Sequence, residues 1–100
     1  MSARGFILLW LAGCGTSIDP HDYKRSCAAD SECVAVYGGD VCALCPCPTD
    51  GIAASDLPRY QKDTASLKSH CSKTTPPVDC EPCPAMLAFC LDGTCSIHPQ

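Results

Sequence analysis

The chain has 100 residues and a formal net charge of −4, and 11 of its residues are cysteine. A chain of this length has room for one small domain with a thin hydrophobic core, and such a high cysteine content marks a disulfide scaffold when the chain is exported. The 7 Lys and Arg residues are scattered among 11 acidic residues and form no basic patch, which argues against a nucleic acid as partner.

The first 13 residues have the charged, apolar and small-residue order of a secretory signal. Arg4 supplies the positive charge, residues 6–12 are uninterruptedly apolar, and small residues come just before Cys14. So short an apolar run cannot cross a membrane, which takes about 20 helical residues. We therefore predict a signal peptide over residues 1–13. It is shorter than the usual length of about 15–30 residues, which leaves an upstream start codon open.

The end of this segment, Leu11-Ala12-Gly13-Cys14, resembles the lipobox of bacterial lipoproteins. The resemblance implies that the Cys14 thiol receives diacylglycerol, that the chain is cleaved before Cys14, and that the new amine is acylated, for instance with palmitate. Two or more acyl chains anchor a protein stably in a membrane. Gly15 stands where an Asp would imply retention in the inner membrane. We therefore expect a lipoprotein of the cell envelope that faces outside the cytoplasm, in the outer membrane rather than the inner one, with ordinary secretion as the alternative.

Residues 15–26 are polar, contain a proline and show neither a helical nor a strand period. Together with the lipidated Cys14 they predict a flexible tether over residues 14–26, which spans at most about 40 Å. The cysteine-rich domain is then expected over residues 27–98.

A first β-hairpin is predicted near the start of this domain. Residues 33–37 are rich in β-branched and aromatic side chains, residues 38–40 read Gly-Gly-Asp, and residues 41–45 return as a second strand. The prolines that follow end regular pairing.

One helix is predicted over about residues 56–70. Its core face is formed by residues at steps of three and four along the chain: Leu57, Tyr60, Thr64, Leu67 and Cys71. Ser55 or Asp56 can cap the helix, and a proline suits its first turn. Arg59 and Asp63 have the spacing of a weak surface ion pair.

A second hairpin is predicted around Asp92-Gly93, because both turn positions need a positive φ. With a two-residue loop, Cys90 faces Cys95 and the two share one side of the sheet. The fold class is therefore a small disulfide-rich α+β domain, with two hairpins and one helix packed on them.

Ten cysteines remain when Cys14 is set aside, and an even number can pair completely: Cys27, Cys33, Cys42, Cys45, Cys47, Cys71, Cys80, Cys83, Cys90 and Cys95. Spacing does not determine which of them pair. Cys45 and Cys47 are poorly placed to bond each other, whereas Cys90 and Cys95 could bond across their hairpin or reach separate partners, and we favour the second arrangement. An odd cysteine is a liability in an exported chain, so a lipidated Cys14 makes the count consistent.

A zinc site is the competing interpretation of four of these cysteines, which form two C-x2-C pairs: Cys42, Cys45, Cys80 and Cys83. It would leave six cysteines unexplained, and export oxidises thiols. The spacing from Cys27 to Cys95 also resembles cysteine-rich modules of bacterial exported proteins, with Asp30-Ser31-Glu32-Cys33 near its start and Cys90-Leu91-Asp92-Gly93-Thr94-Cys95 at its end. That resemblance implies a fold more than an activity.

No nucleophile motif, phosphate loop or paired-carboxylate arrangement is present in the sequence, so we expect neither an enzyme nor a cofactor. The leading hypothesis is a lipid-anchored, monomeric binding or structural module whose partner is an extracytoplasmic protein or ligand. A protease inhibitor is the alternative, because disulfide scaffolds hold loops rigid. Its candidate loops are Pro48–Ala54 and Ser72–Val78. A zinc-binding protein is the third hypothesis.

Overall fold

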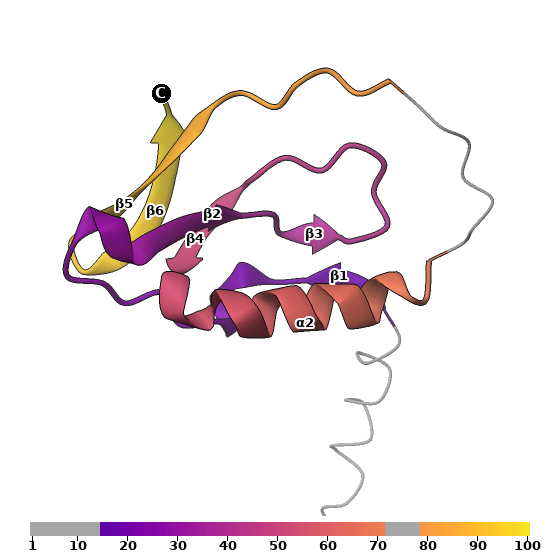
Figure 1. Ribbon diagram of the computed structural model, residues 1–100, viewed down its shortest axis with the longest axis horizontal. Helices are drawn as coiled ribbons and strands as arrows, with labels where there is room; N and C mark the ends of the chain where they lie inside the picture. The colour runs from indigo at the N-terminus through magenta and orange to yellow at the C-terminus, as the bar shows by residue number, and fades with distance from the viewer. Residues whose placement is uncertain (1–14, 72–78) are drawn as a thin grey trace, which may run out of the picture.

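The computed structural model describes residues 15–71 and 79–100 (Figure 1). The predicted signal peptide and Cys14 lie outside the described residues. Within the described part, the elements follow in this order: β1 (Ser17–Ile18), the 3-10 turns η2 (Pro20–Asp22) and η3 (Asp30–Glu32), β2 (Cys33–Val36), β3 (Gly39–Asp40), β4 (Asp50–Ala53), the 3-10 turn η4 (Ala54–Asp56), the helix α2 (Leu57–Lys68), β5 (Met86–Leu91) and β6 (Thr94–Pro99). No helix among these residues combines the length and the apolar character needed to span a membrane.

The strands of the described residues form three antiparallel pairs, β1 with β3, β2 with β4, and β5 with β6. Figure 1 shows the β5–β6 hairpin at one end, beside β2 and β4, while α2 runs along β1. One helix on several short antiparallel pairs, tied by disulfides, is a small disulfide-rich α+β fold, and the predicted fold class is confirmed.

The first predicted hairpin is wrong in its second strand. β2 pairs with β4, and not with residues 41–45. β4 is the stronger partner because residues 51–53 are all buried, and Ile52 has no exposed surface at all. Residues 41–45 turn away from the sheet, where Cys42 and Cys45 each form a disulfide with a distant cysteine. The composition of residues 41–45 predicted them as the partner of β2, but β4 is the partner because it can be buried there.

The segment predicted as a flexible tether is packed into the fold instead. Ile18 and Tyr23 keep only 6% and 8% of their surface exposed and belong to the core. Pro20 is buried against Gly38, where an added Cβ atom would lie 2.5 Å from a ring carbon of the proline. These apolar residues are separated by polar ones, so they show no period along the chain although they share one packing surface.

Residues 24–27 connect β4 to the hairpin. The Lys24 carbonyl accepts a hydrogen bond from the Ala53 N–H at 2.8 Å, and the Arg25 carbonyl accepts one from the Cys95 N–H at 2.7 Å. The Cys27 N–H donates to a turn carbonyl of the hairpin at 3.0 Å. The folded domain therefore begins before Cys27, and residues 17–26 are part of it and not of a tether.

The predicted helix is confirmed as α2. Tyr60 is its buried residue, and Leu57 and Leu67 pack partly buried against the same core. Asp56 stands at the N-cap position, but its carboxylate bonds Arg59 at 2.9 Å instead of the helix N–H groups. Arg59 thus pairs with Asp56 and not with the predicted residue four positions later.

The second predicted hairpin is confirmed. Asp92 and Gly93 have φ values of 51° and 83°, as the two-residue turn requires. Cys90 lies opposite Cys95, as predicted, and the two strands extend the pairing to Met86 and Pro99.

The hydrophobic core is small, because it consists of six buried side chains: Ile18, Tyr23, Val36, Val41, Ile52 and Tyr60. Tyr23 and Tyr60 meet edge to face with ring centroids 5.6 Å apart, which joins the N-terminal segment to α2. So little buried apolar surface leaves much of the constraint on the fold to disulfides.

Candidate functional site

The structure pairs all ten cysteines that follow Cys14, in the number that the sequence predicts. The five disulfides are Cys27–Cys90, Cys33–Cys95, Cys42–Cys71, Cys45–Cys80 and Cys47–Cys83. Cys90 and Cys95 reach separate partners from one side of their hairpin, which confirms the arrangement that the sequence favoured. The sequence could not have supplied the rest of this connectivity, because each bridge joins residues that are at least 29 positions apart.

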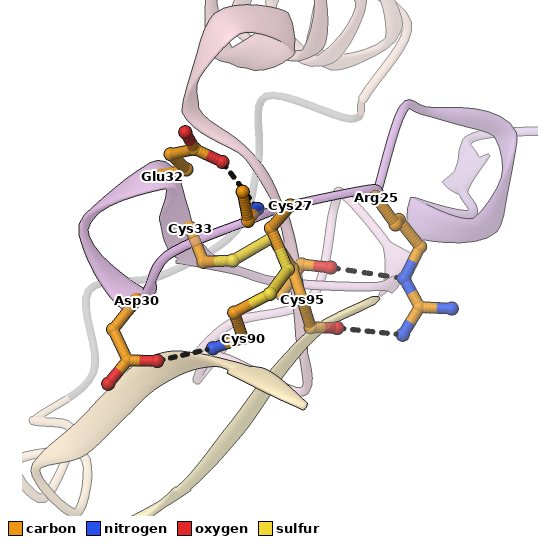
Figure 2. The surroundings of a disulfide bond; sticks show 9 residues. Arg25, Cys27, Asp30, Glu32, Cys33, Cys90 and Cys95 are labelled. Carbon is orange, nitrogen blue, oxygen red and sulfur yellow. Dashed lines mark hydrogen bonds between the residues drawn. A yellow bond between two sulfur atoms is a disulfide. The ribbon is translucent and has the colours of Figure 1, made fainter. Parts of the chain in front are cut away.

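Two of these disulfides form one cluster, which we call the paired-disulfide cluster: Cys27–Cys90 and Cys33–Cys95. They attach the hairpin to β2 and to the segment before η3 at one end of the fold (Figure 2). The Sγ atoms of Cys27, Cys33 and Cys95 all lie within 4.8 Å of one another. These sulfurs could suit a metal ion only as thiolates, and here they are held in disulfides.

Hydrogen bonds from the loop before β2 frame this cluster. The Asp30 carboxylate accepts from the Cys90 N–H at 2.9 Å, and the Glu32 carboxylate accepts from the Ala28 N–H at 2.6 Å (Figure 2). The N–H groups of Cys90 and Ala28 do not bond a neighbouring strand, and these carboxylates supply the acceptors that they need. The two acidic side chains therefore hold the chain around Cys27 and Cys33 in place.

Arg25 fastens the other side of the cluster. Its Nε donates to the Gly51 carbonyl at 3.1 Å and its second terminal nitrogen donates to the Cys95 carbonyl, also at 3.1 Å (Figure 2). A planar guanidinium can hold two carbonyls at once in this way. Sequence reasoning missed Arg25 because it was assigned to the tether, although its place two residues before Cys27 was a usable signal.

The other three disulfides hold one exposed segment, residues 42–49, which we call the bridged loop. Cys42, Cys45 and Cys47 are bonded to the end of α2 and to the segment around residues 80–83. Leu44 lies between two of these cysteines with 53% of its surface exposed. No sequence pattern singled out Leu44, because its exposure depends on where its neighbours are bonded.

Asp40 fixes the base of the bridged loop. Its carboxylate accepts from the Cys42 N–H at 2.9 Å and from the Thr16 hydroxyl at 2.8 Å. These bonds hold the pKa of Asp40 below its ordinary value, with the Cys42 N–H as the larger cause. At neutral pH the carboxylate is therefore ionised and the loop entry stays tied to the N-terminal segment.

The four cysteines of the zinc hypothesis do not come together as thiolates. Cys45 and Cys80 bond each other, while Cys42 bonds Cys71 and Cys83 bonds Cys47, so all four sulfurs are held in disulfides. A four-cysteine zinc site needs free thiolate ligands, and the zinc hypothesis is wrong for this folded form.

The structure describes one of the two candidate inhibitor loops. Pro48–Ala54 is wrong as an exposed loop, because Asp50–Ala53 form β4 and its last three residues are buried. Ser72–Val78 lies outside the described residues. The exposed, covalently held segment is the bridged loop immediately before β4.

A charged network joins the N-terminal segment to α2. The Arg59 guanidinium lies over the Tyr23 ring, 4.2 Å from its centroid, and the Tyr23 hydroxyl donates to the Asp63 carboxylate. Burial, and then the bond to Asp63, raise the pKa of Tyr23, while Arg59 and the Lys24 N–H lower the pKa of Asp56. Each group is thus paired within the fold, which suits a structural role.

Two of the surface hollows of the described residues lie beside these elements. The larger, of about 400 Å³, is lined by side chains from Lys24, Glu32 and three serines. The second, of about 290 Å³, lies beside Tyr23 and includes the carboxylate of Asp63. Every buried side-chain polar atom among the described residues has a hydrogen-bond partner, so no buried unsatisfied group marks either hollow as a ligand site.

Comparison of the chain with protein-family models, with curated proteins and with solved structures finds no match. The features of the molecule that bear on its function are therefore the disulfide framework and the exposed bridged loop.

Proposed function

We propose that the chain is a lipid-anchored, extracytoplasmic cysteine-rich module that binds a protein or ligand outside the cytoplasm. Five disulfides in so small a domain are a feature of proteins that fold in an oxidising compartment. The observation that carries the proposal is the pairing pattern itself. The ten downstream cysteines bond among themselves, so the odd cysteine of the chain is Cys14, the residue that the lipobox resemblance selects.

The packed N-terminal segment leaves only a short stretch of chain between the proposed lipid on Cys14 and the folded domain. The Thr16 carbonyl accepts from the Val41 N–H at 2.9 Å, so the fold begins two residues after Cys14. Cys14 and Ile18 are four residues apart, which is at most about 14 Å of extended chain. A lipid on Cys14 would therefore hold the domain directly against the membrane surface, where its partner would have to be a membrane-proximal molecule.

Lipidation is tested by feeding cells a labelled fatty acid and comparing the chain with its Cys14→Ser variant. We expect the unaltered chain to take up the label and to sediment with membranes, and the variant to do neither. Cys71→Ser is the matched control, because it also removes one cysteine but lies outside the lipobox, and it should keep the label. Label that persists in Cys14→Ser would refute the anchor.

Inhibition of a serine protease is the second candidate activity, and Leu44 is the observation that favours it. Leu44 is exposed, and Cys42 before it and Cys45 after it are each cross-linked elsewhere. If a protease cleaved the peptide bond after Leu44, the two new chain ends would stay attached to the domain through the disulfides of Cys42 and Cys45. The cleaved loop could therefore not dissociate from the protein. A preformed loop also loses little entropy on binding. The fitting partner is a protease whose specificity pocket takes a large aliphatic side chain.

This candidate is tested by measuring inhibition of proteases with apolar and with acidic specificity pockets. We expect inhibition of the apolar-pocket enzymes, its loss in Leu44→Asp, and a shift to the acidic-pocket enzymes in Leu44→Lys. Leu87→Asp is the matched control, because Leu87 is similarly exposed at 46% but lies on the hairpin. If no apolar-pocket protease is inhibited, or if Leu87→Asp has the same effect as Leu44→Asp, this candidate fails.

A further inference from the structure

We propose that the paired-disulfide cluster is a thiol–disulfide exchange site, at which an external thiolate converts Cys27–Cys90 and Cys33–Cys95 into Cys27–Cys33 and Cys90–Cys95. The thiolate that starts the exchange comes from a small thiol or from a reactive thiol of an exported protein, and it is released again at the end. This activity does not depend on the lipid anchor, and it concerns the end of the fold opposite the bridged loop.

The distances between sulfur atoms carry the first step of the argument. Cys33 and Cys95 are bonded, and the Cys27 Sγ lies within 4.8 Å of both of their sulfurs. The two bonds lie side by side in Figure 2. A thiolate released at Cys27 would therefore already be beside a second disulfide, which is the arrangement that exchange needs. Among the described residues, the other three disulfides show no such close grouping of three sulfur atoms.

The strand register supports one of the alternative pairs, and the sulfur positions support the other. Cys90 and Cys95 are directly opposite in the β5–β6 register, and their N–H groups point outward, to Asp30 and to the Arg25 carbonyl. They are therefore a non-hydrogen-bonded pair, for which the Cα atoms lie about 4.5 Å apart. A disulfide accepts Cα separations of about 4.4–6.8 Å. The Cys27 and Cys33 sulfurs are already within 4.8 Å of each other.

Exposure sets the order of attack. Cys33 and Cys95 keep only 7% and 0% of their surface exposed, whereas Cys27 and Cys90 are half-buried. A thiolate from solution can therefore reach the Cys27–Cys90 bond but not the Cys33–Cys95 bond. The buried Cys33–Cys95 bond can be attacked only by a sulfur of the protein itself, that of Cys27.

The exchange balances without any oxidant or reductant. The external thiolate attacks the Cys90 sulfur, forms a mixed disulfide there and releases the Cys27 thiolate. Cys27 then attacks the Cys33 sulfur, forms Cys27–Cys33 and releases the Cys95 thiolate. Cys95 attacks the mixed disulfide at Cys90, forms Cys90–Cys95 and returns the external thiolate. Two protein disulfides exist before and after, and the external thiol acts as a catalyst.

The product differs from the starting form in what the bridges connect. The two starting bridges join cysteines 63 and 62 residues apart, so they fasten the hairpin to β2 and to the segment before η3. In the product each bridge closes a short local loop, and these two covalent links between the hairpin and the N-terminal half are gone. The hairpin then depends on hydrogen bonds such as those of Arg25 to stay in place.

The direct test is the Cys90→Ser variant, which leaves a thiol at Cys27 beside the intact Cys33–Cys95 bridge. The folded protein is alkylated, and cleavage at Asp30 and Asp92 separates the cysteines for mapping. We expect the label to be shared among Cys27, Cys33 and Cys95. Label on Cys27 alone would overturn the proposal. Cys71→Ser is the control, and its label should stay on the single released thiol.

A second measurement keeps the proposal testable if that variant fails to fold. The unaltered protein is incubated with less than one equivalent of reduced glutathione, quenched with an alkylating agent and mapped in the same way. We expect Cys27–Cys33 and Cys90–Cys95 peptides to appear while the number of protein thiols stays unchanged. Glutathione bound at Cys27 or Cys90 with an intact Cys33–Cys95 bridge, and no exchanged peptide, would refute it.

Discussion

Gly51→Ala is expected to destabilise the protein, because β4 has no room for a side chain at this position. A Cβ atom on Gly51 would lie 3.1 Å from the Ser96 nitrogen, 3.1 Å from the Ser96 oxygen and 3.2 Å from the Cys95 carbonyl carbon. All three are backbone atoms of β6, so no side chain can rotate aside and the hairpin itself would have to move. The same movement would strain the bond from Arg25 to the Gly51 carbonyl.

Two opposing effects determine the sign of this change. Replacing Gly by Ala where the backbone allows it stabilises a protein by about 0.4–1 kcal/mol, because the unfolded chain loses freedom. Overpacking a closed site costs about 1–3 kcal/mol. We therefore expect the free energy of unfolding to fall by about 1–2 kcal/mol, measured by urea denaturation with the disulfides intact.

Gly93→Ala is the control, because nothing lies within 4 Å of its added Cβ and only its φ of +83° opposes the change. It should weaken the turn without altering amide exchange at β4, whereas Gly51→Ala should speed exchange on both β4 and β6. A Gly51→Ala protein that is more stable than the unaltered chain would show that β4 does not pack on the hairpin as described.

Two further predictions concern Tyr23 and Arg25. The pKa of Tyr23 is raised above its ordinary value of 10.0 in the folded protein, so as the pH rises the unfolded chain loses this proton first. The stability that Tyr23 contributes should therefore be complete below about pH 10 and should decline above it. Tyr23→Phe should flatten that alkaline decline, and an identical decline in both proteins would contradict the assignment. Arg25→Leu removes charged hydrogen bonds to two carbonyls and should lower the free energy of unfolding by about 2 kcal/mol. Amide exchange at Cys95 should become faster in this variant, and unchanged exchange would argue against the clamp.

The elements that the sequence predicted correctly are those with local signals. Asp92-Gly93 specifies its turn through the φ values that the turn needs. The face that includes Tyr60 and Leu67 repeats at helical steps, and Pro58 sits at the helix start. In both cases, residues within one turn of each other carry the information.

The elements that it missed depend on distant partners. Residues 41–45 have the composition of a strand, but the disulfides of Cys42 and Cys45 draw them away and leave β2 to pair with β4. Ile18 and Tyr23 look isolated among polar neighbours, and only packing against residues of β2, β4 and α2 gathers them into a core. Leu44 and the paired-disulfide cluster follow from connectivity, which cysteine spacing does not reveal.

The most direct test of the account is the intact mass of the protein extracted from membranes, measured before and after reduction. We expect an N-terminal fragment that begins at Cys14 and carries acyl chains, and a gain of two hydrogens for each of five disulfides. A mature chain that begins elsewhere, or one without lipid in which Cys14 is disulfide-bonded to another cysteine, would contradict it.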